Sequence, residues 1–229
     1  MKILAIDTSA KAASCAICED GKLLAECFQN NGLTHSKTIM PLIENMLSCC
    51  NEKIENIDKI AVAAGPGSCT GLRIGVSAAK GMSWASGIPV CGVSTLEAMA
   101  WQFSFIKETL CVVMDARAGQ VYNAIFKFEN GELKRLCPDR AIALQDLLEE
   151  LKGIGEIFLV GDGALLCYNE GINAGVSLSV PADAQLQSRA SGVALASQNI
   201  QGDSAEKLEI FYHRLPQAER ERLAKLNNK

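Results

Sequence analysis

A glycine-rich stretch at residues 65–75 constrains the fold of this chain more than any other feature. An apolar run at residues 59–64 precedes it and predicts a buried strand, and small residues from about Thr70 to Ser86 predict a helix. A glycine turn between a strand and a helix can bind an anion, because the first N–H groups of the helix lack partners there. The same turn can instead serve close packing inside the fold. The sequence leaves both interpretations open.

The stretch matches neither of the two common phosphate-binding patterns. A Walker A loop needs a lysine directly after its last glycine, and no register of this stretch supplies one. A dinucleotide-binding loop needs three glycines. In the register that starts at Gly65 the third of these positions is Thr70, and Pro66 lacks an N–H donor. The turn is therefore neither of these motifs.

Two predicted strands end in an aspartate and then lead into a hairpin. The first strand, near the N-terminus, ends at Asp7, and the second ends at Asp115. This recurrence indicates two related lobes of an α/β protein with mixed sheets. We expect an N-terminal lobe at residues 1–104 that carries the partner-binding helices, and a smaller C-terminal lobe with the chain end at residues 105–229.

Five residues lie in turns that could contact a nucleotide or could simply stabilise the backbone. They are Asp7, Gly65, Gly67, Asp115 and Arg117. The turn at Asp7 and the hairpin after it resemble the opening of the actin/Hsp70/sugar-kinase superfamily, whose ATPases bring this turn close to the phosphates and the metal. For the second turn, an ion pair between the aspartate and the arginine is the structural alternative to ligand contact.

The glycine-rich stretch, Gly-Pro-Gly-Ser-Cys-Thr-Gly-Leu-Arg-Ile-Gly, resembles the signature of the TsaB family. This family supplies a non-catalytic subunit to the bacterial machinery that makes threonylcarbamoyladenosine in tRNA. A His-Ser-x-x-x-x-Pro-Leu-Ile spacing from His35 and an Asp-Ala-Arg…Val-Tyr element from Asp115 are similar to other parts of the family. The resemblance covers the first hundred residues most strongly and weakens after Tyr122. It implies a two-lobed fold of the actin/Hsp70/sugar-kinase class.

The resemblance also implies a function. A TsaB-type subunit dimerises with the catalytic paralogue TsaD and supports it. TsaD transfers threonylcarbamoyl to N6 of adenosine 37 in tRNAs that read ANN codons, and the small ATPase TsaE joins the assembly. We therefore expect a chain that contacts tRNA only through the complex and has no cofactor of its own, with ATP or ADP at the complex interface as an open alternative. Expressed alone, the chain is expected to form a homodimer.

Two predicted helices, near residues 39–50 and 70–86, are the expected docking surface for TsaD. The partner-facing residues predicted on them are Ile39, Ile43, Met46, Leu47, Gly71, Ile74, Gly75, Ala78 and Met82. Small residues at helical spacing let another backbone approach closely, and each glycine costs helix propensity. The alternative partner for this stripe is the sheet of the same lobe. If the stripe faces TsaD, Ala78→Arg should abolish binding without unfolding the chain.

The histidine content argues against a catalytic metal centre. In TsaD, the helix that matches residues 94–100 carries two metal-binding histidines one turn apart. This chain places Thr95 and Met99 there, and a hydroxyl and a thioether do not form a hard divalent-metal site. The chain has only two histidines, His35 and His213, so no helix can present a pair. We expect no metal site.

Composition and charge limit the remaining function classes. The net charge of −4 and the pI near 5.3 leave no large basic face for tight, independent RNA binding. The ten cysteines are scattered, and the chain begins without a signal-peptide pattern, so we expect a reduced, cytoplasmic protein. No apolar run is long enough to cross a membrane. The mixed-charge residues 217–225 are expected to be solvated.

Two rival functions remain. An ATP-dependent kinase or ATPase of the same superfamily would use the two aspartate turns and the glycine turn around a metal-bound nucleotide. A peptidase is the weaker rival, because a metal version lacks its histidine pair and no Gly-x-Ser-x-Gly motif is present. Autonomous ATP turnover would distinguish the ATPase from a non-catalytic subunit.

Overall fold

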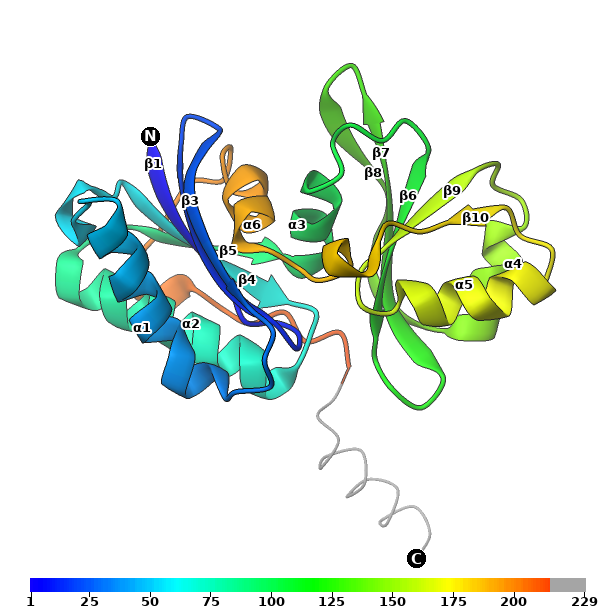
Figure 1. Cartoon of the computed structure of the whole chain (residues 1–229), viewed down its shortest axis with the longest axis horizontal. Coiled ribbons are helices and arrows are strands. Elements are labelled where there is room, and N and C mark those ends of the chain that lie inside the picture. The colour runs from blue at the N-terminus through cyan, green and yellow to red at the C-terminus, as the bar shows by residue number, and fades with distance from the viewer. Residues whose placement is uncertain (215–229) are drawn as a thin grey trace, which may run out of the picture.

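The computed structural model describes residues 1–214, so the predicted solvated end at 217–225 lies outside the described residues. These residues form two lobes, each built on a five-stranded mixed sheet (Figure 1). The sheet of the first lobe has the order β3-β2-β1-β4-β5 and consists of β1 (Lys2–Asp7), β2 (Ala13–Glu19), β3 (Lys22–Gln29), β4 (Lys59–Gly65) and β5 (Val90–Ser94). The sheet of the second lobe has the order β10-β9-β6-β7-β8 and consists of β6 (Thr109–Asp115), β7 (Gln120–Glu129), β8 (Glu132–Ala143), β9 (Ile157–Val160) and β10 (Leu178–Ser179).

The two sheets have the same strand plan. In each lobe a strand that ends in aspartate, β1 or β6, pairs antiparallel with the strand that follows it and parallel with a later one, β4 or β9. In the register of the first lobe, Asp7 lies opposite Ser14, and in the second lobe Asp115 lies opposite Val121. The mixed sheets and the repeated plan confirm the predicted two-lobed α/β fold class.

Helices cover both faces of each sheet (Figure 1). The outer face of the first sheet carries α1 (His35–Cys49) and α2 (Cys69–Ser86), and the outer face of the second carries α4 (Leu144–Leu151) and α5 (Ala164–Asn173). Two short helices, α3 (Thr95–Trp101) and α6 (Ala190–Ala196), lie between the sheets. Residues 1–214 also contain three single 3₁₀ turns: η1 (Ile54–Asn56), η2 (Asp183–Gln185) and η3 (Ala205–Lys207). No helix of the described chain is both long and apolar enough to cross a membrane.

The first helix buries one apolar face against the sheet of its own lobe. Ile39, Ile43 and Met46 recur at helical spacing and are each at most 2 % exposed. They pack with strand residues such as Ile17 and Val62 in a single apolar cluster. The helix begins at His35 and carries Pro41 within it.

The C-terminal part of the described chain returns to the first lobe. Helix α6 places Ala190, Val193 and Ala194 against small side chains of the first sheet, including Ala5 and Ala61. Small residues on both sides allow the helix to lie close to the strands. The prediction that all of residues 105–229 belong to the second lobe is therefore corrected, because residues 190–196 pack against the sheet of the N-terminal lobe.

Side chains from the first sheet form hydrogen bonds with the free backbone N–H and carbonyl groups at both ends of α6. At the N-terminal end, Ser14 Oγ accepts the Ala190 N–H at 2.8 Å and Glu26 Oε1 accepts the Ser191 N–H at 2.9 Å. At the C-terminal end, the Lys59 ammonium donates to the Ser197 carbonyl at 2.6 Å. It also donates to the Ile200 carbonyl at 2.8 Å. These bonds supply partners that the short helix cannot provide for itself.

The buried lysine gives the first prediction. Lys59 is 3 % exposed, and no carboxylate forms an ion pair with it within residues 1–214. Lys59→Met keeps the apolar stem but removes two charge-assisted donors, so we expect the free energy of unfolding to fall by about 2–4 kcal/mol. Urea unfolding measures this change. Lys207→Met is the matched control, because that side chain is 70 % exposed and should shift stability by less than about 0.5 kcal/mol. Equal effects of the two substitutions would contradict the capping role.

Candidate functional site

The end of β1 is a buried polar turn. Asp7 is 2 % exposed, and its Oδ1 accepts hydrogen bonds from the Ser9 N–H at 2.8 Å and the Ser9 hydroxyl at 2.6 Å. Its Oδ2 accepts the Ser188 hydroxyl, which comes from the segment that leads into α6. Burial raises the pKa of Asp7, and the hydroxyl and N–H donors oppose part of that rise. The carboxyl group is therefore enclosed by the chain's own donors.

The glycine turn between β4 and α2 is also filled by the chain itself. Gly65 has φ 135° and Gly67 has φ 158°, in the region that favours glycine. A methyl group on Gly65 would lie 2.3 Å from the Phe211 carbonyl oxygen. On Gly67 it would lie 2.4 Å from the Ser9 carbonyl oxygen. Of the two interpretations left open by the sequence, this geometry favours close packing within the fold.

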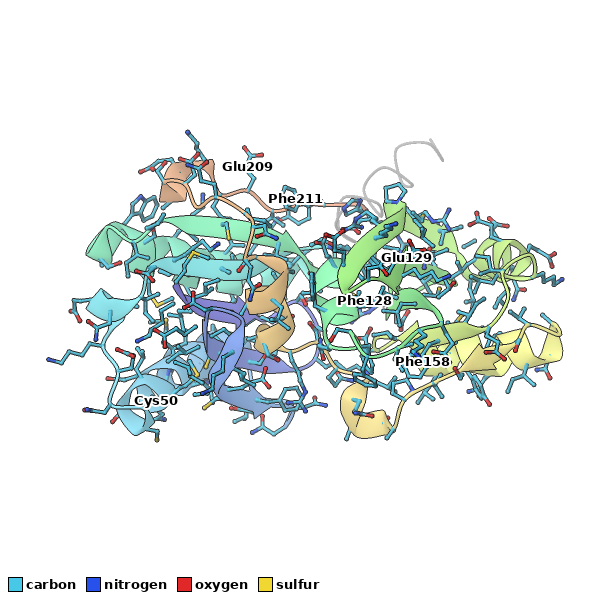
Figure 2. All side chains as sticks on the ribbon, turned by 90° about the horizontal axis from the view of Figure 1, so that it is seen from above. Cys50, Phe128, Glu129, Phe158, Glu209 and Phe211 are labelled. Carbon is cyan, nitrogen blue, oxygen red and sulfur yellow. The ribbon has the colours of Figure 1, made fainter. Side chains whose placement is uncertain are left out.

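The C-terminal segment, defined here as residues 203–214, covers this turn. Its Phe211 N–H donates to the Ala64 carbonyl at 2.8 Å, just before the first glycine. Phe211 lies near the junction of the lobes, on a stretch that runs from the first lobe toward the second (Figure 2). At the other end of the segment, Asp203 pairs with Val90 of β5 in an antiparallel bridge. Sequence patterns gave no signal for these contacts, because they join residues more than a hundred positions apart.

The matching turn of the second lobe lies after β6. Asp115 is exposed, and its Oδ1 accepts the Arg117 N–H at 2.7 Å. Its own N–H donates to Asp162 Oδ1 at 3.3 Å, and burial raises the pKa of Asp162. The ion pair with the Arg117 guanidinium, one of the two alternatives for this turn, is not formed among residues 1–214, where Asp115 contacts the backbone N–H of Arg117. The aspartate therefore shapes the turn as an N–H acceptor.

The first turn of α3 holds the two residues predicted to replace the metal ligands of TsaD. Thr95 is fully buried and Met99 is 1 % exposed, one turn apart on the same helix. The Thr95 hydroxyl oxygen has no hydrogen-bond partner among the described residues. Nor do residues 1–214 bring three or more His, Cys, Asp or Glu side chains together in a group that could hold a metal ion.

The predicted docking residues separate into two sets. Ile39, Ile43 and Met46 are buried in the core of the first lobe. Gly71 and Gly75 lie against Thr8, and a methyl group on either would approach its carbonyl or hydroxyl oxygen to 2.0 Å or 2.4 Å. The expectation that these five residues face a partner is therefore corrected: their side of each helix faces the sheet of the same lobe. Helical periodicity identified the apolar face but could not tell which surface it covers.

The other predicted docking residues lie nearer to the solvent. Leu47, Ile74, Ala78 and Met82 are half-buried at the edge of the core. On the outward side of α2, Ile74 and Ala78 adjoin three exposed residues, Ser77, Gly81 and Ala85. We call these five residues the outer α2 stripe. A methyl group on Gly81 would meet no atom within 4 Å, so this part of the helix is open.

His35 has a structural role at the start of α1. Its Nε2 lies 2.9 Å from the Ala10 carbonyl oxygen, to which it donates a hydrogen bond. This contact joins the helix start to the loop after β1. The functional residues that the sequence analysis missed are Ser188, Asp162, Phe211 and Arg214, each of which contacts a predicted turn from a distant part of the chain.

Comparison of structures defines the class of this protein. A crystal structure from Pseudomonas aeruginosa, described as an uncharacterized protein with similarity to peptidase YeaZ, superposes with a TM-score of 0.78. The two chains are 24 % identical, and the match covers 93 % of this chain and 99 % of the other. The ethanolamine utilization protein EutJ from Carboxydothermus hydrogenoformans gives a TM-score of 0.53 at 12 % identity, over 86 % and 90 % of the two chains. The fold is thus the two-lobed fold of the actin/Hsp70/sugar-kinase class.

Sequence comparison identifies the family. The family model of TsaD, tRNA N6-adenosine threonylcarbamoyltransferase, matches residues 29–213. The TsaB protein of Bacillus subtilis is 39 % identical over 66 % of each chain, and that of Buchnera aphidicola is 31 % identical over 70 % of this chain and 78 % of its own. TsaB of Escherichia coli is 38 % identical over 57 % of this chain and 58 % of its own. The match therefore spans between 58 % and 78 % of the length of these relatives. The chain belongs to the TsaB family.

The buried aspartate gives the second prediction. Because the pKa of Asp7 is raised in the folded state, the folded chain holds a proton that the unfolded chain, with a pKa near 3.8, has already released. Wild-type stability should therefore fall as the pH rises from 3.8 through the folded-state pKa. Asp7→Asn has no carboxyl group to titrate at this position. We expect the stability of the wild type relative to Asp7→Asn to be higher at about pH 4 than at about pH 7.

Urea unfolding at the two pH values measures this difference. The matched control is Glu170→Gln, which removes an exposed carboxylate on α5. A difference between wild type and Asp7→Asn that stays the same at both pH values, or that changes in the opposite direction, would contradict the role of burial.

Proposed function

We propose that this chain is a non-catalytic subunit required for the synthesis of threonylcarbamoyladenosine in tRNA. In this proposal it dimerises with TsaD, which transfers threonylcarbamoyl to N6 of adenosine 37 in tRNAs that read ANN codons, and TsaE joins them. Membership of the TsaB family supports the pathway, because the Bacillus subtilis and Escherichia coli relatives are named tRNA threonylcarbamoyladenosine biosynthesis proteins. The net charge of −4 supports contact with tRNA through the complex rather than through this chain alone.

The residues at the start of α3 support the proposal that the chain is non-catalytic. A metal-dependent transferase needs ligands that bind a cation, such as imidazole or carboxylate groups. Thr95 and Met99 supply a hydroxyl and a thioether, and both side chains are enclosed in the core. A metal-dependent transfer reaction on this chain would therefore need a metal site elsewhere, because neither residue can serve as its ligand.

The ATPase alternative gains no support from the turns that it would use. In the proposed subunit Asp7 is enclosed by serine donors, and the Phe211 carbonyl lies against Gly65, where an ATPase would need space for phosphate oxygens. ATP or ADP at an interface with TsaD stays a prediction, as does a cytoplasmic location.

The outer α2 stripe is the proposed docking surface for TsaD. It presents Ser77, Gly81 and Ala85 to the solvent on one side of a long helix. Small side chains allow a partner helix to approach closely, and little side-chain entropy is lost when they become buried. On the same helix, Trp84 is 63 % exposed and could pack against a partner at the border of the stripe.

The third prediction concerns catalysis. Purified chain alone should bind no stoichiometric zinc or iron and should perform no threonylcarbamoyl transfer, because residues 1–214 bring no group of three metal-binding side chains together. Addition of TsaD and TsaE from the same source should restore transfer to tRNA. Elemental analysis after dialysis and a transfer assay test the two parts. One metal equivalent per chain, transfer by the chain alone, or full transfer by TsaD and TsaE without it would overturn the proposal.

The fourth prediction replaces a residue of the stripe. Gly81→Arg places a long, charged side chain at an exposed position where a Cβ atom meets no described atom within 4 Å, so the fold should be kept. Arginine favours a helix more than glycine does, and the free energy of unfolding should rise by up to about 1 kcal/mol. Binding to TsaD should nevertheless be lost, because a charge would be buried without a partner in a close helix contact. This variant separates binding from stability better than Ala78→Arg does, because Ala78 is half-buried in its own lobe and an arginine there could also disturb the fold.

Co-purification with TsaD and a calorimetric midpoint measure these two effects. The control is Asn169→Arg, an exposed position on α5 that should leave binding unchanged. The proposed homodimer of the isolated chain uses the same stripe, so analytical ultracentrifugation should find Gly81→Arg monomeric. Unchanged binding of Gly81→Arg to TsaD would contradict the docking surface.

A further inference from the structure

The C-terminal segment spans both lobes, but it is held very differently at its two ends. On the first lobe, Ala205 and Leu208 are buried in the core, and Asp203 and Phe211 pair with strand backbone. On the second lobe, its hydrogen bonds among residues 1–214 come from a single side chain, that of Arg214. The segment is thus built into one lobe and attached to the other through one residue.

Polar contacts to α2 strengthen the attachment to the first lobe. The Trp84 indole N–H donates to Glu206 Oε1 at 2.8 Å. The Arg73 Nε–H donates to the Tyr212 hydroxyl at 3.0 Å, and the guanidinium carbon lies 5.8 Å from the centre of the same ring. These contacts bring the segment along the side of α2 and direct its last residues toward the second lobe.

The contact on the second lobe is to a strained turn. One terminal guanidinium nitrogen, Nη1 of Arg214, donates to the carbonyl oxygens of Ala116 and Arg117, the latter at 3.1 Å. The chain then passes through three consecutive left-handed residues, with φ 63° at Arg117, 53° at Ala118 and 70° at Gly119. Residues other than glycine adopt this conformation only at a cost in free energy, so surrounding contacts must hold it. Arg214 provides contacts of this kind from outside the turn.

We propose that Arg214 is a latch. It holds the turn at residues 116–119 in its left-handed conformation and, by the same two hydrogen bonds, fixes the C-terminal segment across the two lobes. When the latch opens, the turn relaxes and the end of the segment leaves the second lobe, while its buried residues stay in the first lobe. This inference concerns the conformation of the chain itself, so it stands independently of the proposed partner.

Hydrogen exchange tests the latch on the complete chain. In Arg214→Ala, amide exchange should become at least about tenfold faster at residues 116–121, the factor expected when a charge-assisted hydrogen bond is lost. Exchange at Phe211 and in β4 should not change, because the Phe211 N–H stays bonded to the Ala64 carbonyl of the first lobe. The neighbouring substitution His213→Ala is the control, because His213 is exposed and forms no hydrogen bond with the described residues. Unchanged exchange at residues 116–121 in Arg214→Ala would overturn the proposal.

A double-mutant cycle tests whether Arg214 holds the turn at residues 116–119 in its strained, left-handed conformation. Ala118→Gly permits the left-handed conformation without its cost, so it should raise the thermal unfolding midpoint of the wild type. In the Arg214→Ala background the turn has already relaxed, and the gain from Ala118→Gly should be smaller. An equal gain in both backgrounds would show that Arg214 does not hold the turn and would overturn the proposal.

Discussion

The position of α2 depends on its close approach to the end of β1. The backbone of the helix at Gly71 and Gly75 lies directly on Thr8, and the Thr8 hydroxyl donates to the Gly71 carbonyl at 2.7 Å. Any side chain at these two glycines would push the helix away from the sheet. The start of the helix is fixed at the same place, because the Ser68 N–H donates to the Ser9 carbonyl at 2.7 Å and the Ser68 side chain accepts the Gly71 N–H.

The polar turns at the strand ends of the first lobe are enclosed by the chain itself. Asp7 has serine hydroxyls around it, and the Phe211 carbonyl lies on Gly65. The hydroxyls satisfy a buried carboxyl group that would otherwise need water or another donor. Ser188 and Phe211 both belong to the C-terminal quarter of the chain. The same part of the chain also contains α6, which packs on the first sheet, and Arg214, which donates to the second lobe, so closure of the turns and assembly of the lobes are linked.

The sequence predicted the parts of the fold that depend on local patterns. The strand and hairpin after Asp7, the glycine turn and the helix that follows it rest on turn chemistry and periodicity within about twenty residues, which a single chain displays directly. The contacts of Ser188 and Arg214 join residues 181 and 98 positions apart, and no local pattern encodes them. The error at Ile39, Ile43 and Met46 has another cause. An apolar helix face requires cover, but the sequence does not state whether a sheet or a partner provides it.

The placement of α6 affects the order in which the two lobes can be completed during synthesis. All strands of the second sheet lie between Thr109 and Ser179, so that sheet has every strand available once this stretch has left the ribosome. The first sheet is made earlier, yet its inner face receives α6, Ala190–Ala196, only after the second sheet has been made. Nascent domains usually fold in order from the N-terminus. Here the lobe that is begun first is the one that is finished last, because part of its alanine-lined inner face waits for a helix that follows the second lobe in the chain.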